Sequence, residues 1–184
     1  MMSATEPRAA AAQWLPAERL GECRVEAGLR PWLIGKGPLC ERLREHLGSR
    51  FELRAGEPWT AVLDVDERRH LGTGDGAALY REEALCCEGR TWALVRAILP
   101  DSTLAAHPWF AELGEAGLGE TLAGLSGVVR GKYEYAWLPE GSPLARGTPS
   151  ERAPGGLWAR RCRVCLRGAP LALYEMFLPG LGQA

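Results

Sequence analysis

Alternating apolar and polar positions in the last quarter of the chain predict a β-hairpin, because side chains two residues apart share one face of a strand. The apolar face of the first predicted strand holds Trp158, Cys162, Val164 and Leu166, while Arg161, Arg163 and Arg167 fall on the other face. After a turn placed at Gly168-Ala169, the apolar face continues with Leu171, Leu173 and Phe177. We take this stretch, from Gly155 to Pro179, as the one around which the rest of the chain is organised.

Two ionisable residues, Arg160 and Glu175, interrupt the apolar face of this hairpin. A turn that pairs Arg167 with Pro170 sets Glu175 opposite Cys162 and diagonal to Arg160, within reach of a long side chain. A carboxylate on an apolar face is costly unless it is paired or hydrogen-bonded. The pattern therefore predicts a buried carboxylate beside a guanidinium.

Changes of period along the rest of the chain predict further strands with short helices between them. Leu39, Leu43 and Leu47 recur every fourth residue and predict an amphipathic helix that ends at Gly48. The other predicted elements are an irregular segment with one helical turn at 13–35, strands at 51–54, 60–65, 78–87, 91–99 and 128–137, a loop at 66–76, and helical segments at 102–113 and around 121–122. Antiparallel strands with intervening helices are typical of the α+β class.

The chain of 184 residues predicts a single domain, 1–184, with residues 1–12 as a frayed leader. Residues 138–156 are rich in Pro, Gly, Ser and Arg, which is typical of a flexible loop. The 22 basic and 23 acidic residues nearly cancel, so we expect neither nucleic acid nor a membrane as partner. No apolar run has the length of a membrane span or a secretory signal, and we expect a soluble, cytoplasmic monomer.

The cysteines and histidines lack the spacing of a metal site. Cys162 and Cys165 have the CxxC form, but residues three apart in a strand point to opposite faces. We therefore expect buried free thiols and no metal.

Four ionisable residues stand on strand patterns among apolar neighbours: Arg81, Arg96, Arg160 and Glu175. For each one alone, the favoured interpretation is a side chain whose stem lies on apolar surface and whose head reaches water. Together, several guanidinium groups with fewer carboxylates leave hydrogen-bond donors for an organic anion that carries a carboxylate. No Walker sequence, dinucleotide fingerprint, nucleophile elbow or HExxH motif is present, so these residues alone predict a pocket and no reaction.

Several short motifs resemble the bacterial chorismate pyruvate-lyases, over roughly Trp32 to Pro179. The similarity is weaker at 66–76 and is lost at 138–152, where this chain has extra loop residues. The motifs are Tyr80-Arg81-Glu82, Leu85-Cys86, Trp92, Arg96, Pro100, Ser102-Thr103-Leu104, Gly156-Leu157-Trp158-Ala159-Arg160-Arg161 and Glu175-Met176-Phe177-Leu178-Pro179.

This resemblance implies an antiparallel sheet whose helical flaps cover an internal pocket. It implies an enzyme that converts chorismate to 4-hydroxybenzoate and pyruvate for ubiquinone biosynthesis, without metal or organic cofactor. Because flap-like helices at 39–47 and 104–122 would enclose the pocket, we also expect slow release of the product and inhibition by it. Arg81 would hold the ring carboxylate with help from backbone groups near Leu39 and Leu118, and Glu175 would meet the para oxygen. Arg96 and Arg160 are secondary candidates.

Two other classes of function stay open. One is a non-catalytic module that binds an aromatic carboxylate and is related to the effector domains of transcription regulators. The other is an interaction domain whose arginines pair only with surface acids. Addition of chorismate, followed by the absorbance of 4-hydroxybenzoate, separates the three.

Overall fold

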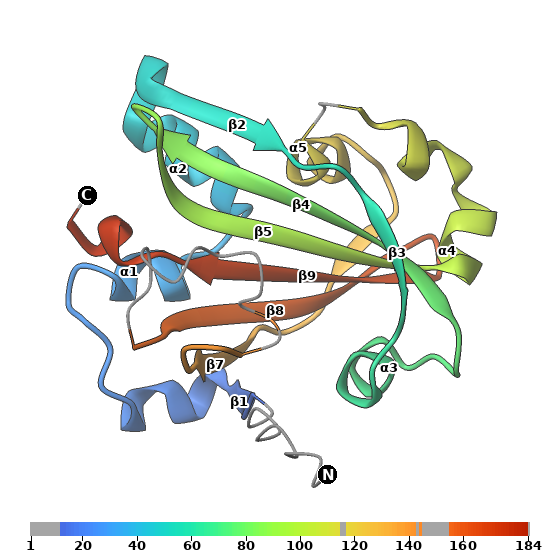
Figure 1. Cartoon of the computed structure of the whole chain (residues 1–184), viewed down its shortest axis with the longest axis horizontal. Helices are drawn as coiled ribbons and strands as arrows, with labels where there is room; N and C mark the ends of the chain where they lie inside the picture. The colour runs from blue at the N-terminus through green and yellow to red at the C-terminus, as the bar shows by residue number, and fades with distance from the viewer. Residues whose placement is uncertain (1–11, 115–116, 143, 145–154, 184) are drawn as a thin grey trace, which may run out of the picture.

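The computed structural model describes residues 12–114, 117–142, 144 and 155–183 (Figure 1). In chain order, the elements are β1 (Leu15–Pro16), η1 (Ala17–Glu22), α1 (Arg30–Ile34), α2 (Leu39–Leu47), η2 (Gly48–Arg50), β2 (Phe51–Ala55), β3 (Trp59–Val62), α3 (Val65–Leu71), β4 (Ala77–Cys87), β5 (Arg90–Pro100), α4 (Asp101–Ala106), η3 (Pro108–Glu112), α5 (Leu118–Ala123), β6 (Val128–Arg130), β7 (Glu134–Leu138), β8 (Leu157–Leu166), β9 (Ala169–Phe177) and η6 (Pro179–Gln183).

Within the described residues, nine strands form one sheet in which every pairing is antiparallel. The strand order is β1-β7-β8-β9-β5-β4-β2, with β3 also paired to β4 and β6 to β8. The hairpin β8–β9 therefore lies in the middle of the sheet, between β7 and β5. The prediction of an α+β fold with one antiparallel sheet is confirmed.

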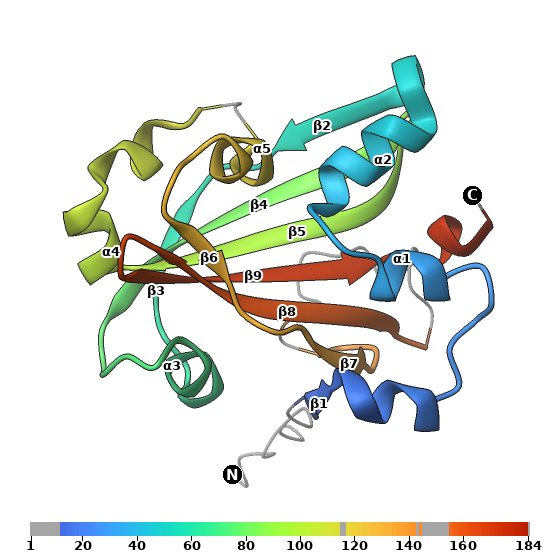
Figure 2. The same cartoon turned by 180° about the vertical axis from the view of Figure 1, so that it is seen from behind.

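The two faces of the sheet have different covers. Figure 2 shows α1, α2 and α5 in front of one face, which we call the helix face. Its core joins leucines of these helices, such as Leu43 and Leu122, to sheet residues such as Leu85 and Leu173. The opposite face carries α3 and is the one turned to the reader in Figure 1. Tyr174 and other sheet residues there pack in one apolar cluster with residues of the α3 region.

The turn between β8 and β9 differs from the predicted one. Leu166 pairs with Ala169, so Arg167 and Gly168 form a two-residue turn. Both have positive φ, 49° and 90°, which is the conformation that a type I′ hairpin turn requires. The prediction of a turn at Gly168-Ala169 is wrong because Arg167, a non-glycine residue, adopts the left-handed conformation.

This turn shifts the register by two residues, which preserves the predicted faces and changes the partners. Glu175 lies directly opposite Arg160, and Cys162 lies opposite Leu173. The prediction that Glu175 faces Cys162 and stands diagonal to Arg160 is therefore wrong in register. The predicted burial of a carboxylate beside a guanidinium is confirmed, and the two residues lie directly opposite each other, which is closer than the predicted diagonal placement.

The predicted loop at 66–76 is partly a helix, α3, which begins at Val65. Its start is fixed by a capping box in which the Asp64 carboxylate accepts a hydrogen bond from the Glu67 N–H at 2.8 Å. In return, the Glu67 carboxylate accepts one from the Asp64 N–H at 2.9 Å. The helix ends at Gly72, which has the left-handed conformation typical of a C-cap. The preceding strand is consequently shorter than predicted and ends at Val62.

Three other predicted elements are divided or extended in the structure. The predicted strand 128–137 is two strands, β6 and β7. The helical segment 102–113 is interrupted at His107, and the segment 13–35 holds β1, η1 and α1 in place of one helical turn. Most of the predicted leader 1–12 and of the predicted loop 138–156 lies outside the described residues.

We expect Asp64→Ala to lower the free energy of unfolding by about 1 kcal/mol, because the substitution removes the acceptor of the α3 cap. For a chain of this size, that corresponds to a fall in Tm of about 2–4 °C. Thermal unfolding followed by circular dichroism measures it. Asp75→Ala is the matched control, since Asp75 is 85% exposed and its ion pair with Arg68 should contribute little. Equal Tm values for the two variants would contradict the prediction.

Candidate active site

The helix face brings together three of the charged residues predicted for the site. Arg81 lies on β4, Glu175 on β9 and Arg160 on β8, and all three are buried. Leu39 and Leu118, also buried, are the first residues of the covering helices α2 and α5. A backbone N–H in the first turn of a helix has no acceptor within that helix, so it is available to other acceptors.

Arg96 lies on the opposite face, so the grouping of Arg96 with Arg81 is wrong. The cause is a β-bulge between Leu85 and Cys86, which shifts the register of β4 against β5 by one residue and pairs Arg81 with Ala97. Arg96 instead pairs with Glu82, at 3.0 Å from Nε and 2.7 Å from Nη2.

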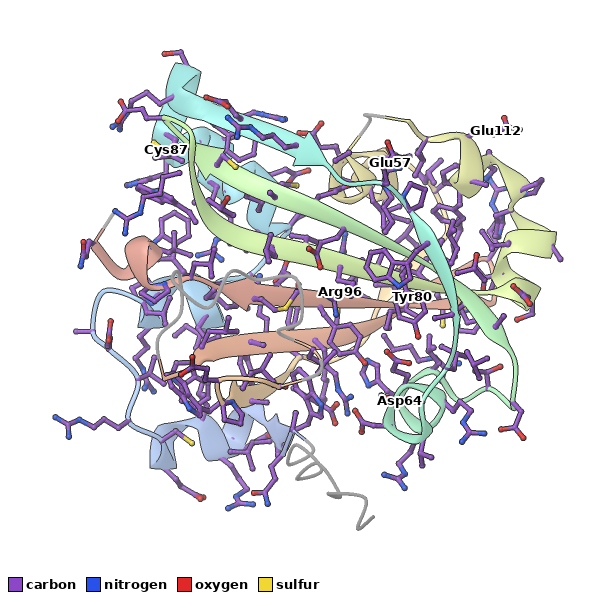
Figure 3. The ribbon with its side chains drawn as sticks, viewed as in Figure 1. Glu57, Asp64, Tyr80, Cys87, Arg96 and Glu112 are labelled. Atoms are coloured by element: carbon purple, nitrogen blue, oxygen red, sulfur yellow. The ribbon has the colours of Figure 1, made fainter. Side chains whose placement is uncertain are left out.

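Arg96 contacts an aromatic side chain of the opposite face. Its guanidinium lies over the ring of Trp59, with the central carbon 5.5 Å from the ring centroid. Trp59 also stacks on Tyr80, and Figure 3 shows Tyr80 and Arg96 near the point where β3 crosses the sheet. Arg96 therefore belongs to a packed ion pair away from the helix face.

Glu83, which the sequence patterns did not single out, joins two of the predicted groups. It is 2% exposed, and its Oε1 accepts hydrogen bonds from Arg81 Nε at 3.2 Å and from the Leu118 N–H at 2.7 Å. Nη2 of Arg81 donates to the carbonyl oxygen of Gly114. The signal for Glu83 was its position two residues after Arg81 on the same strand, which places both side chains on one face.

The second half of the site is the ion pair between Arg160 and Glu175. Arg160 is fully buried, and its Nε donates to Oε2 of Glu175. Its Nη1 donates to the carbonyl oxygens of Leu33 at 3.0 Å and Gly35 at 2.6 Å, at the end of α1. Its guanidinium also lies 4.2 Å from the ring centroid of Tyr133.

Two electrostatic features follow from the burial of this pair. Burial disfavours the charge on Arg160, but the Glu175 carboxylate outweighs it and raises the pKa of Arg160 above its usual value. Nη2 of Arg160 is buried and has no hydrogen-bond partner among the described residues. A charged donor in this situation favours an anionic ligand.

Small apolar side chains form the floor between the two halves of the site. Val95 and Ala97 of β5 separate β4, with Arg81 and Glu83, from β9, with Glu175. Two steps between neighbouring strands place β4 and β9 about 10 Å apart. The helix face thus has charged groups on either side of an apolar strip that suits a flat, apolar ring.

The covering helices α2 and α5 are packed directly against each other. A Cβ added at Gly119 would lie 2.9 Å from Sγ of Cys40, so glycine allows this close approach. Arg44 and Glu120 form an ion pair at the exposed edge of the same contact. The charged groups beneath are consequently shielded from water.

Two buried cysteines, Cys40 and Cys162, have thiols that are hard to ionise. Burial raises the pKa of Cys40 and of Cys162 to about 11, so both thiols are protonated at neutral pH. All six cysteines are free, and four of them are buried. Among the residues that the structure describes, no group of three or more His, Cys, Asp and Glu side chains could hold a metal ion. The expected absence of a cofactor stays a prediction.

A hollow of about 620 Å³ lies beside the site, at the far end of the hairpin. Trp158 and Phe177 line it together with the segment that includes Arg24 and Glu26. None of the predicted site residues lines it. The charged groups, and not this hollow, therefore define the candidate site.

An antiparallel sheet with one face covered by helices places this protein in a known fold class, to which solved effector domains of transcription regulators belong. The effector domain of PhnF from Mycobacterium smegmatis has a TM-score of 0.53 and 18% identity, over 80% of this chain and 92% of that domain. The C-terminal domain of the histidine utilization repressor from Pseudomonas syringae has a TM-score of 0.55 and 6% identity, over 71% and 93%. Identities this low indicate a shared fold only.

The family is shown by sequence. The chorismate lyase family model matches residues 9–182. A probable chorismate pyruvate-lyase of Pseudomonas putida is 33% identical over 100% of this chain and 97% of that protein. The chorismate pyruvate-lyase of Erwinia tasmaniensis is 29% identical over 94% and 89%. The chain belongs to the chorismate lyase family, a family of lyases, and the resemblance seen in its motifs is confirmed. Each helix in the described part of the chain is too short or too polar to span a membrane.

Proposed function

We propose that this protein is a chorismate pyruvate-lyase, which converts chorismate to 4-hydroxybenzoate and pyruvate without metal or organic cofactor. The observation that carries the proposal is the buried apolar strip of Val95 and Ala97 with charged groups on either side. Membership of the family supports the reaction. The product would enter ubiquinone biosynthesis, as the resemblance implies.

The substrate matches the charges of the site. Chorismate is a dianion whose ring carboxylate and 4-hydroxyl lie at opposite ends of a six-membered ring. Arg81 and the Leu118 N–H would bind the ring carboxylate, and Glu175 would meet the para oxygen. Nη2 of Arg160 is the available donor for the carboxylate of the enolpyruvyl group.

The reaction requires positioning more than activation. The ether bond at ring carbon 3 breaks with its electrons moving to the oxygen, and the proton of carbon 4 leaves as the ring becomes aromatic. The enolpyruvyl carbon takes up a proton to give pyruvate. Arg160 stabilises the charge that develops on the leaving group, in a site closed from water by α2 and α5. Glu175 is the candidate base for the proton of carbon 4.

The test is to incubate the purified protein with chorismate in EDTA and to follow 4-hydroxybenzoate by absorbance and pyruvate by a coupled assay. Equal amounts of both products, formed at a rate proportional to protein, are expected. Binding of 4-hydroxybenzoate without turnover would favour the alternative, a non-catalytic module. The likeness to regulator domains reflects the fold and does not itself favour that alternative.

We expect 4-hydroxybenzoate to inhibit the reaction, because a product held beneath two packed helices should leave slowly. Progress curves should slow earlier than substrate depletion predicts, and added 4-hydroxybenzoate should lower the initial rate. Added pyruvate is the control, since it lacks the ring. Curves that fit simple depletion and ignore added 4-hydroxybenzoate would contradict this expectation.

A further inference from the structure

A carboxylate of the protein itself occupies the subsite proposed for the ring carboxylate. Oε1 of Glu83 accepts both the Arg81 Nε–H and the Leu118 N–H, at 3.2 and 2.7 Å. These two donors come from β4 and α5, which are distant in sequence. They are also the donors that the proposed function assigns to the ring carboxylate, and the present inference rests on that assignment.

The two carboxylates cannot share these donors. Each of the two nitrogens carries one hydrogen, so each makes one well-aligned hydrogen bond at a time. Two negative carboxylates on one guanidinium would also repel each other, and burial strengthens that repulsion. A displaced Glu83 carboxylate would find few water molecules as hydrogen-bond partners, because Glu83 is 2% exposed beneath α5.

We propose that Glu83 is an internal competitor for the carboxylate subsite. It accepts the hydrogen bonds of Arg81 and Leu118 when the site is empty, and an aromatic carboxylate displaces it on binding. The affinity for such a ligand is therefore the difference between two similar sets of charge-assisted hydrogen bonds. Glu83 thereby lowers the affinity for substrate and product, and it favours release of the product.

The competition predicts that the binding affinity depends on the charge of the ligand and on the charge of residue 83. Glu83→Gln keeps an acceptor oxygen for Arg81 and Leu118 but removes the negative charge. 4-Hydroxybenzoate should then bind about tenfold more tightly or better, since displacing a neutral amide costs less than displacing a carboxylate. 4-Hydroxybenzamide, a neutral analogue of the same shape, should gain much less.

The experiment is calorimetric titration of both ligands into the wild-type protein, Glu83→Gln and the matched control Glu82→Gln. Glu82 is the neighbouring residue on the opposite face, paired with Arg96, so its change should leave both affinities as they are. We expect tighter binding only in the Glu83→Gln variant and only for 4-hydroxybenzoate, the ligand that carries a carboxylate. Weaker or unchanged binding, an equal gain for both ligands, or no binding to any of the three proteins would overturn the proposal.

A structure of the wild-type protein with 4-hydroxybenzoate tests the same point if Glu83→Gln fails to fold. The ligand carboxylate should accept the Leu118 N–H, with Glu83 turned away. Glu83 still bound to Arg81 and Leu118 would overturn the proposal. Turnover of chorismate by the wild-type protein is a separate result. If the protein turns over chorismate but Glu83→Gln does not bind 4-hydroxybenzoate more tightly, only the proposal for Glu83 is overturned. If Glu83→Gln binds more tightly but the protein does not turn over chorismate, only the proposed lyase reaction is overturned.

Discussion

Replacement of Glu175 by Gln is expected to lower kcat by about a hundredfold or more while the protein still folds. The amide neither accepts a proton nor hydrogen-bonds the developing para oxygen as a carboxylate does. The amide oxygen of the variant would still accept a hydrogen bond from Nε of Arg160, whose Nη1 keeps the carbonyls of Leu33 and Gly35. We therefore expect the free energy of unfolding to fall by only about 1–3 kcal/mol.

Melting temperature and kcat, measured on the same preparation, separate the catalytic from the structural interpretation of Glu175. The matched control is Glu82→Gln, the same change at a carboxylate paired with an arginine on the opposite face. It should leave kcat close to that of the wild-type protein. A Glu175→Gln protein with a lower Tm and an unchanged kcat would make Glu175 a structural residue.

Replacement of Arg81 by Lys is expected to lower kcat/KM by about ten- to a hundredfold, roughly 1.4–3 kcal/mol. In the proposed complex the guanidinium would bind the ring carboxylate while its Nη2 keeps the Gly114 carbonyl, a fork that an ammonium group cannot reproduce. Arg81→Ala should cost more, because it removes the charge and leaves the buried Glu83 carboxylate without its ion pair. Steady-state kinetics with chorismate measures both variants.

Arg96→Lys is the control for this comparison, because Arg96 is also buried and paired with a carboxylate but lies on the opposite face. Its kcat/KM should stay within a few-fold of the wild-type value. An Arg81→Ala protein that folds and retains normal kinetics would remove Arg81 from the site.

The faces of the final hairpin could be predicted from the sequence because alternation is local. Arg160 and Glu175 interrupt an apolar face that the pattern identifies without reference to the rest of the chain. Their direct pairing could not be predicted, since it depends on the left-handed conformation of Arg167 in the turn. A shift of two residues keeps every side chain on its face, so the apolar pattern contains no information about it.

Arg96 and Arg81 lie on different faces of the sheet because of the β-bulge between Leu85 and Cys86. Cys87 pairs with Arg90, and without the bulge the same register would set Arg81 opposite Arg96 on one face. The bulge moves Arg96 to the other face, and no local pattern predicted it. Glu83 was within reach of sequence reasoning, because it alternates with Arg81, but its contact with Leu118 requires the packing of α5.

The hydrogen bonds of Arg160 join Glu175, the proposed base, to the end of α1, and so to the segment that leads into α2. If the proposed roles hold, a variant designed for faster product release should keep Arg160, since a change there would alter both the proposed site and the attachment of the covering helices. The contact of α2 with α5 can be changed to speed product release without a substitution at Arg160. Its Arg44–Glu120 ion pair lies at the partly exposed edge, so charge changes there should weaken the contact between α2 and α5 while the buried groups keep their positions.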